Sequence, residues 1–413
     1  MIIHTKNWIP KSVKTTESTE VELNIINERE SLLDILKIKD KIIHSLEKGA
    51  KTAKELSKEL SIASRTIRKN LNILRIEGIV KRDFGERINN SFRYSDKWEI
   101  LKNPNLNLEV PKNMICVWYK SPYPIGAFRY NYIFLPKKIE INEELLVSFG
   151  FFVAEGSKTK FRAIEITNSE PELIKTFLKS FYNFDIKKSM WRWRIVFNRK
   201  FRNFLNEESI NNLEISSKNF WLETCKLYDK NFINFVYSGQ KSGKIRKGSP
   251  TWGTLNIQYN NALFAGIMMN FFENIKPLAL ENNELAINYL RGYLSGEAYV
   301  GTRDREIQIG SKNKNELIFC KFLLEKIGVR CSLCKSTTTS PPRIIITNLD
   351  SFLTLNEYDI FKFHPYKKKN LLTKLLNYRN LEKSSIKDNL EKINDIILQR
   401  EVPFKPFIEK IFT

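Results

Sequence analysis

The chain of 413 residues is long enough for two or three domains with hydrophobic cores, and 42% of its residues are hydrophobic. Its formal net charge of +22 at pH 7 favours a polyanionic partner, most simply nucleic acid, although a solvated lysine-rich surface would give the same composition. The sequence has neither an apolar run of membrane-spanning length nor the layout of a signal peptide. We therefore expect a cytoplasmic, nucleoid-associated protein with no membrane partner.

The five cysteines are scattered, and one pair, Cys331 and Cys334, has CxxC spacing. A zinc site needs a second pair of ligands at suitable spacing, which this sequence lacks. We expect ordinary reduced thiols.

The N-terminal part of the chain predicts a small helical domain. Residues 1–29 are polar and predict a tail. Apolar residues at helical spacing then predict three helices, the last of which ends at Gly78, and "IVKRDFGERINNSFRYSDK" predicts two short strands around a turn. Over residues 30–98 this order resembles the winged helix-turn-helix domains, in which the second helix of the motif lies in the major groove.

That resemblance implies a set of DNA-contacting side chains at the start of the third helix and in the hairpin. A winged helix can also serve as a protein–protein module, and the sequence leaves that alternative open. The implied contacts are Ser64, Arg65, Thr66, Arg68 and Lys69 on the helix, with Arg82 and Arg87 on the hairpin.

Two apolar helices predicted further along the chain each end in a glutamate. After a linker and extended segment at 99–135, "SFGFFVAEG" ends one helix with Glu155, and "LRGYLSGEA" ends the other with Glu297. A strand, an amphipathic helix, a hairpin and another helix follow each glutamate in the same order. The repeat predicts two similar units packed with pseudo-two-fold symmetry in a monomer.

The repeat sets the expected boundaries of the remaining chain. The first unit is expected at 136–214 and the second at 281–385, with an insertion or linker at 215–280 between them. Residues 386–413 predict a terminal helix and a short apolar tail without evident chemistry.

Small residues predict how the two apolar helices meet. Gly150 and Gly292 would allow the backbones to cross closely, which brings Glu155 and Glu297 together at the helix ends. Two adjacent carboxylates ionise together only if a cation lies between them, and Mg²⁺ is the usual cation for oxygen ligands. Such ions can activate water and stabilise the leaving oxygen of a phosphodiester. The alternative is a pair of solvated, inert acids. The expected ligands are Glu155, Glu297 and the main-chain carbonyls of Ala154 and Gly296.

At these residues the chain resembles the LAGLIDADG homing endonucleases in their single-chain form, over residues 136–385. The nine-residue motif corresponds to 148–156 and to 290–298. The resemblance implies an α+β fold, in which the N-terminal winged helix precedes two pseudo-symmetric αββαββα units packed through their motif helices. It also implies sheets that form a saddle over double-stranded DNA, and Mg²⁺-dependent double-strand cleavage with Glu155 and Glu297 as the catalytic acids.

Basic residues on the predicted strands and after the second unit would contact DNA in such a saddle. Trp191 and Trp193 alternate with two arginines, so the aromatic rings should face the core and the arginines the DNA. The expected contacts are Arg162, Arg192, Arg194 and Arg305 on the strands, and Lys367, Lys368 and Lys369 on the DNA backbone.

Several departures from the motif leave a second reading open. Val153 and Ser295 replace the first acid of each motif, and the short segment after Glu155 leaves little room for a long recognition hairpin. Regulators of the WhiA type combine a LAGLIDADG-like unit with a helix-turn-helix domain and do not cut DNA. Because both final acids are retained, the sequence favours the endonuclease over a non-cleaving transcription regulator.

Overall fold

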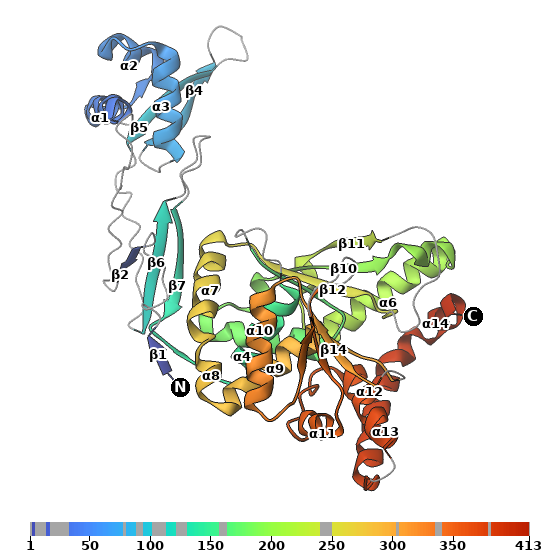
Figure 1. The fold of residues 1–413 in the computed structure, drawn as a ribbon. Coiled ribbons are helices and arrows are strands. Elements are labelled where there is room, and N and C mark those ends of the chain that lie inside the picture. Colours follow the sequence, from blue (N-terminus) through green and yellow to red (C-terminus); the bar gives the residue numbers. More distant parts are fainter. Residues whose placement is uncertain are drawn as a thin grey trace. The chain divides into compact units, whose positions relative to one another are not determined.

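The structure is a computed structural model, and many of its elements are labelled in Figure 1. Its description covers residues 2–4, 14–16, 33–76, 80–87, 94–100, 113–120, 130–156, 163–239, 250–302, 305–334, 341–378 and 381–412. The chain divides into two compact parts, which we call the N-terminal body (residues 11–137) and the core body (residues 138–413 with residues 1–10).

Three helices and a three-stranded sheet make up the first part of the N-terminal body. The helices are α1 (Leu33–Glu47), α2 (Ala53–Leu60) and α3 (Ser64–Ile76), and the sheet has the order β3 (Lys51–Thr52), β5 (Tyr94–Ile100), β4 (Val80–Arg87). A capping box between Thr52 and Glu55 starts α2. The sequence predicted this order of three helices and a hairpin. The core residues are Ile42, Leu46, Ala53, Leu56, Ile67, Leu71, Leu74, Val80 and Trp98.

A second antiparallel sheet completes the N-terminal body. It has the order β2 (Lys14–Thr16), β6 (Met114–Lys120), β7 (Tyr130–Pro136). The segment expected to be a linker with extended structure therefore contributes a paired hairpin.

The second half of the core body has the αββαββα order expected from the sequence. It runs α9 (Asn283–Glu297), β13 (Ala298–Val300), β14 (Ile307–Gly310), α10 (Lys314–Lys326), β15 (Ser332–Cys334), β16 (Arg343–Ile346), α11 (Leu349–Glu357). Its antiparallel sheet has the strand order β13-β14-β16-β15.

The first half of the core body differs from the expected order. It begins with α4 (Glu143–Glu155), β9 (Ile164–Asn168), α5 (Pro171–Ser180) and β10 (Arg192–Asn198). The predicted hairpin ending in β10 is wrong, because the antiparallel partner of β10 is β12 (Thr254–Tyr259). Helix α7 (Ala262–Ile275) follows β12 as α11 follows β16.

The segment between β10 and β12 adds to the first half. It holds α6 (Glu207–Cys225) and β11 (Phe232–Ser238), and β11 pairs in parallel with β10 at the edge of the sheet. The sheet order is β11-β10-β12-β9, and Gly156 bridges to Ile166 at its other end. Residues 215–280 are therefore not a separate insertion. Leu255 and Ile257 of β12 are buried like Trp193 of β10, so the pairing places the apolar residues of both strands on one face of the sheet.

One face of each core sheet is apolar and covered by helices. Trp191 and Trp193 are 1% and 0% exposed, which confirms the prediction that they belong to the core. The buried apolar residues of these strands also include Ile164, Ile166, Ile195, Phe197, Leu255, Ile257, Ala298, Val300, Ile307, Ile309, Ile344 and Ile346. The opposite face of each sheet carries the polar side chains.

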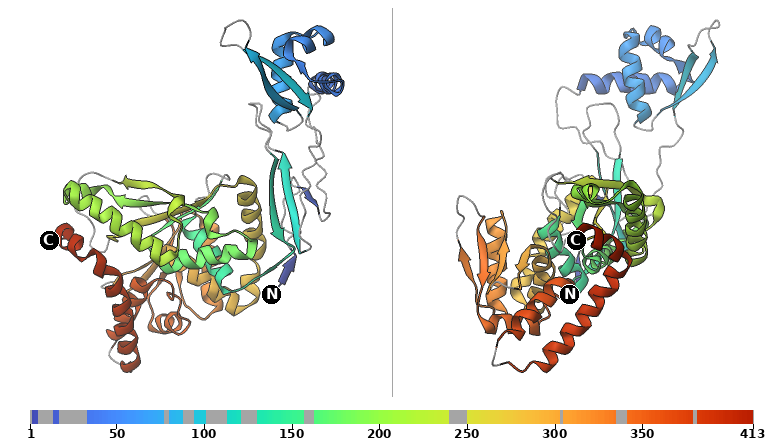
Figure 2. Two further views of the ribbon diagram at one scale, coloured as in Figure 1. Left: turned by 180° about the vertical axis from the view of Figure 1, so that it is seen from behind. Right: turned by 90° about the vertical axis from the view of Figure 1, so that its right-hand side faces the viewer.

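Helices at the C-terminus connect the two halves of the core body and are red in Figure 2. They are α12 (Pro365–Leu376), α13 (Ser384–Glu401) and α14 (Lys405–Phe412). Phe404, between α13 and α14, packs against Phe220 of α6 with ring centroids 5.5 Å apart. Smaller elements are β1 (Ile2–His4) paired with β8 (Lys138–Glu140), α8 (Leu278–Glu281), and 3₁₀ turns at 181–184, 188–190, 199–203, 229–231 and 402–404. Among the described residues, none of the helices is both long and apolar enough to span a bilayer.

Candidate functional site

The two motif helices, α4 and α9, cross with their backbones in direct contact. A Cβ added to Gly150 would lie 2.1 Å from the carbonyl oxygen of Tyr289. A Cβ added to Gly292 would lie 1.9 Å from the carbonyl oxygen of Val147. Each glycine therefore lies where the other helix leaves no room for a side chain. The two contacts are equivalent, because each glycine faces the carbonyl oxygen of the residue three positions before the other glycine.

The C-terminal ends of the motif helices also lie side by side. A Cβ added to Gly296 of α9 would lie 2.5 Å from the Cβ of Ala154 and 3.1 Å from the Cγ of Glu155. The Glu155 side chain thus lies over the last turn of α9, and Glu297 is the next residue of that turn. The fold brings both motif acids to the same end of the crossing.

Lys367 of α12 supplies a positive charge at this end of the crossing. Its Nζ donates hydrogen bonds to the main-chain carbonyls of Leu294 (3.2 Å), Ser295 (2.6 Å) and Gly296 (2.9 Å). These carbonyls end α9 and carry the partial negative charge of the helix C-terminus, which favours a cation.

Burial and charge act against each other at Lys367 and Glu155. Burial lowers the pKa of Lys367 to about 8, although the charges of Glu155, Glu170 and Glu297 act to raise it. The Glu155 side chain is exposed, but the surrounding protein still raises its pKa by desolvation, and Lys367 opposes that change. The ammonium is therefore a countercharge that acts on both motif acids.

This arrangement corrects the expected role of Lys367 and bears on the expected metal site. We expected the lysine to contact the DNA backbone, but its ammonium is turned inward onto α9. The Gly296 carbonyl, an expected Mg²⁺ ligand, already accepts a hydrogen bond from Lys367. Within the described parts of the chain, no cluster of three or more His, Cys, Asp or Glu side chains is suited to a metal ion. The carbonyl of Gly296, which is bonded to the ammonium, fits that cation and does not fit a divalent ion beside it.

A buried ionic cluster next to Lys367 was not found from the sequence. Glu170, at the start of α5, is 3% exposed and pairs with Arg400 of α13 at 3.0 Å. The ring of His364 lies 3.8 Å from the other Glu170 oxygen. Burial raises the pKa of Glu170 to about 7 against the attraction of Arg400, and burial lowers the pKa of His364 well below its usual value. These residues are too far apart in the sequence for any local pattern to show the cluster.

Polar side chains lie on the face of each core sheet opposite the helices, which we call the open face. In the first half Arg192 is exposed, and Arg194 donates to Asn256 at 2.9 Å and to Glu165 at 3.3 Å. In the second half Arg343 donates to Gln308 at 3.1 Å, a contact that the sequence did not suggest. Both open faces thus carry guanidinium groups, beside the buried amide of Asn256 in the first half and the half-buried amide of Gln308 in the second.

The remaining expected DNA contacts have varied surroundings. Arg305 is exposed, Lys368 pairs with Asp359 at 2.8 Å, and Lys369 is half-buried. Arg162 lies outside the described residues.

The expected contacts in the N-terminal body lie largely on one helix. Arg65, Arg68 and Lys69 of α3 are exposed, while Ser64 and Thr66 are half-buried. In the hairpin, the guanidinium of Arg82 lies 5.8 Å from the ring centre of Trp98, and the side chain of Arg87 lies outside the described part of the structure.

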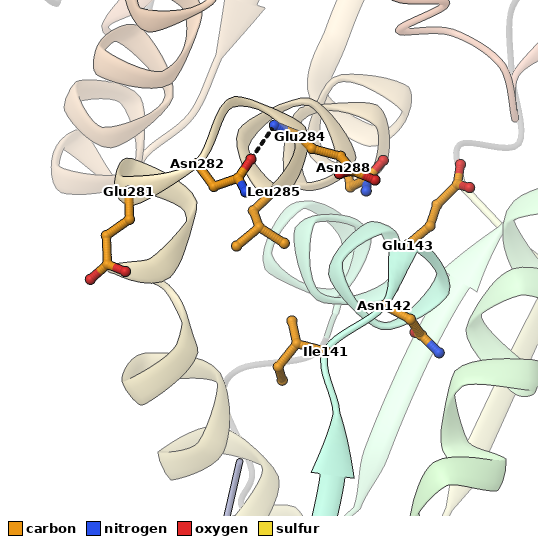
Figure 3. Close-up of a pocket in the computed structure, with 8 residues that line it drawn as sticks. All are labelled: Ile141, Asn142, Glu143, Glu281, Asn282, Glu284, Leu285 and Asn288. Atoms are coloured by element: carbon orange, nitrogen blue, oxygen red, sulfur yellow. Dashed lines mark hydrogen bonds between the residues drawn. The ribbon is translucent and has the colours of Figure 1, made fainter. Parts of the chain in front are cut away.

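A pocket lies at the other end of the motif helices (Figure 3). Its lining includes Asn142 and Glu143 at the start of α4 and Asn282 at the start of α9. Glu143 is neutralised by ion pairs at 2.9 Å with Arg291 and with Lys362. The pocket is separate from Glu155 and Glu297, which end the same helices.

Comparison with known proteins found one protein family whose model matches part of the second half of the core body. A family model described as a LAGLIDADG-like domain matches residues 284–358, which run from α9 to the end of α11. No curated protein matches the chain.

Several solved structures are similar to part of the chain. I-DmoI, a homing endonuclease seen in complex with DNA and Mn, is 14% identical, with a TM-score of 0.29 over 53% of this chain and 98% of that one. Full-length DUF199/WhiA from Thermatoga maritima is 11% identical, with a TM-score of 0.32 over 62% of this chain and 68% of that one. The N-terminal LAGLIDADG domain of DUF199/WhiA is 12% identical, with a TM-score of 0.29 over 53% of this chain and 83% of that one.

Proposed function

We propose that the chain is a double-stranded DNA-binding protein that lays the open faces of its two core sheets on the duplex. The observation that carries this proposal is the matching polar surface of the two halves, where Arg192, Arg194 and Arg343 lie on strands beside amide side chains. Guanidinium groups pair with phosphates and with guanine edges, and amides pair with adenine edges. The net charge of +22 supplies the attraction to the polyanion.

The N-terminal body would add a second DNA contact as a winged helix. In support of this, Arg65, Arg68 and Lys69 project from one helix whose opposite side is buried. Such a helix fits the major groove, and basic side chains at its start reach phosphates and base edges.

DNA cleavage is a second candidate function, favoured by the position of the two motif acids. Glu155 lies against the turn that ends in Glu297, so a phosphodiester placed there would meet both carboxylates. Bound Mg²⁺ would supply charge stabilisation at such a site. The Lys367 ammonium is hydrogen-bonded to the Gly296 carbonyl, an expected ligand of that ion. Cleavage would therefore require this lysine to move. Binding without cleavage, as in a transcription regulator, needs no such movement.

Binding is tested with a randomised duplex library and fluorescence anisotropy at several salt concentrations. We expect the logarithm of the binding constant to fall linearly with the logarithm of the salt concentration, with a slope of about −0.9 per phosphate neutralised. A salt-insensitive affinity, or no binding at low salt, would contradict the proposed DNA binding.

Cleavage is tested on the duplexes selected by binding, with Mg²⁺ or with EDTA. Metal-dependent double-strand breaks that are lost in both Glu155→Gln and Glu297→Gln would establish the endonuclease. Intact duplexes in every lane, with binding unchanged in both variants, would establish binding without cleavage.

A further inference from the structure

We propose that Lys367 is a built-in cation of the motif acids, which takes the place of a divalent ion at the end of α9. The inference rests on the geometry of the two motif helices and does not require that the chain bind DNA. It differs from the expectation from the sequence, in which Mg²⁺ would bind Glu155, Glu297 and the nearby carbonyls.

The first argument is the complete use of the ammonium. A lysine ammonium has three donor hydrogens and no acceptor. Lys367 has three acceptors within hydrogen-bond distance, the carbonyls of Leu294, Ser295 and Gly296. It has no donor left for a phosphate of bound DNA. The ammonium therefore binds the end of α9 and does not bind DNA.

The second argument is that α12 is bonded to the chain both before and after Glu297. Lys367 binds the turn before this acid, and Asn370 donates to the carbonyl of Val300, three residues after it, at 2.7 Å. At the start of α12, the His364 ring accepts a hydrogen bond from the main-chain nitrogen of Lys367. Lys368 also pairs with Asp359 at 2.8 Å. These contacts hold α12 in place beside α9, so withdrawal of the ammonium would break its own hydrogen bonds to the end of α9.

The third argument is electrostatic. The charges of both Glu155 and Glu297 act on Lys367, so its positive charge already offsets part of the negative charge of the two carboxylates. A divalent ion at the same carboxylates would be repelled by the ammonium and would lack the Gly296 carbonyl as a ligand. Replacing Lys367 by a neutral side chain removes the repulsion and frees that carbonyl.

The test is Mn²⁺ binding without DNA, measured by electron paramagnetic resonance of the free ion in the full-length wild type and in Lys367→Met. We expect Lys367→Met to bind one Mn²⁺ at least about tenfold more tightly than the wild type, and this gain to vanish in Lys367→Met with Glu155→Gln. Lys387→Met, which removes an exposed lysine of α13, should behave as the wild type.

Equal Mn²⁺ affinity in the wild type and in Lys367→Met would overturn the proposal. Circular dichroism checks that Lys367→Met is folded. If it does not fold, two measurements still decide. Micromolar Mn²⁺ binding by the wild type that is lost in Glu155→Gln would overturn the proposal. Weak Mn²⁺ binding by both the wild type and the charge-preserving Lys367→Arg would support it. Because the readout is metal binding, the result is independent of whether the protein binds DNA.

Discussion

At the scale of single residues, Gly150 and Gly292 allow the motif helices to cross with no side chain between them. Their occurrence near the middle of two apolar helices was visible in the sequence, and the close approach of the backbones gives it a physical reason. Lys367 was visible only as part of a basic run. Its three acceptors lie 71 to 73 residues before it, and no local pattern connects residues at that separation.

Gly292→Ala should destabilise the core body strongly. Its Cβ would lie 1.9 Å from the carbonyl oxygen of Val147, so the helices must move apart. We expect a loss of about 1–3 kcal/mol or more in the free energy of unfolding, measured by urea denaturation. Gly266→Ala in α7 is the matched control, because nothing lies within 4 Å of the added Cβ. An alanine there should be neutral or stabilise by up to about 1 kcal/mol. Equal effects of the two substitutions would contradict the close crossing.

Glu170 should make the protein less stable as the pH rises. Its pKa is about 7 in the folded chain against 4.5 for the ordinary group, so the folded state holds this proton more tightly. This proton contributes on the order of 3 kcal/mol to the free energy of unfolding. The contribution is fully present below pH 4.5 and is lost as the pH rises through about 7.

The measurement for Glu170 is the free energy of unfolding at pH 5 and at pH 8. The wild type should lose more stability between these values than Glu170→Gln, which keeps a hydrogen-bonding group beside Arg400. Glu208→Gln, at an exposed position on α6, should follow the wild type. Parallel profiles for the wild type and Glu170→Gln would show that the buried carboxyl is not responsible.

At the scale of elements, the sequence predicted the second half well because each of its strands pairs with the strand that precedes or follows it in the chain. The first half was predicted less well, because α6 and β11 separate β10 from its antiparallel partner. The alternation around Trp193 correctly placed the buried face of β10, but a face pattern does not say which later strand pairs with it. Residues 386–413 were expected to have no evident chemistry, because the Glu170–Arg400 pair spans 230 residues and no local pattern in the sequence shows it.

The open face of the first sheet can be tested through Arg192, which is exposed on β10. Arg192→Ala should weaken duplex binding and reduce the magnitude of the salt slope by about 1 if the guanidinium neutralises one phosphate. Lys326→Ala is the control, because this exposed lysine is on α10, which packs against the covered side of the second sheet. Anisotropy titrations at several salt concentrations give both slopes. The same slope for both variants would remove Arg192 from the interface.

At the scale of the whole molecule, the question is whether the N-terminal body and the core body bind one duplex together. Each carries a separate basic surface, with Arg65 and Arg68 on α3 and Arg192 on β10. Two linked modules on one duplex gain affinity from their raised effective concentration, and their phosphate contacts add in the salt slope. Arg65→Ala with Arg68→Ala should therefore reduce the magnitude of the slope by about 2, and adding Arg192→Ala should reduce it by about 1 more.

Duplex length separates joint binding from independent binding in this experiment. A duplex too short for both bodies should lose the affinity gained by linkage and should respond to only one of the two sets of substitutions. A long duplex should respond to both sets. If the α3 substitutions leave the slope unchanged on every duplex, the N-terminal body makes no phosphate contacts, and a protein partner becomes the better interpretation of its exposed helix.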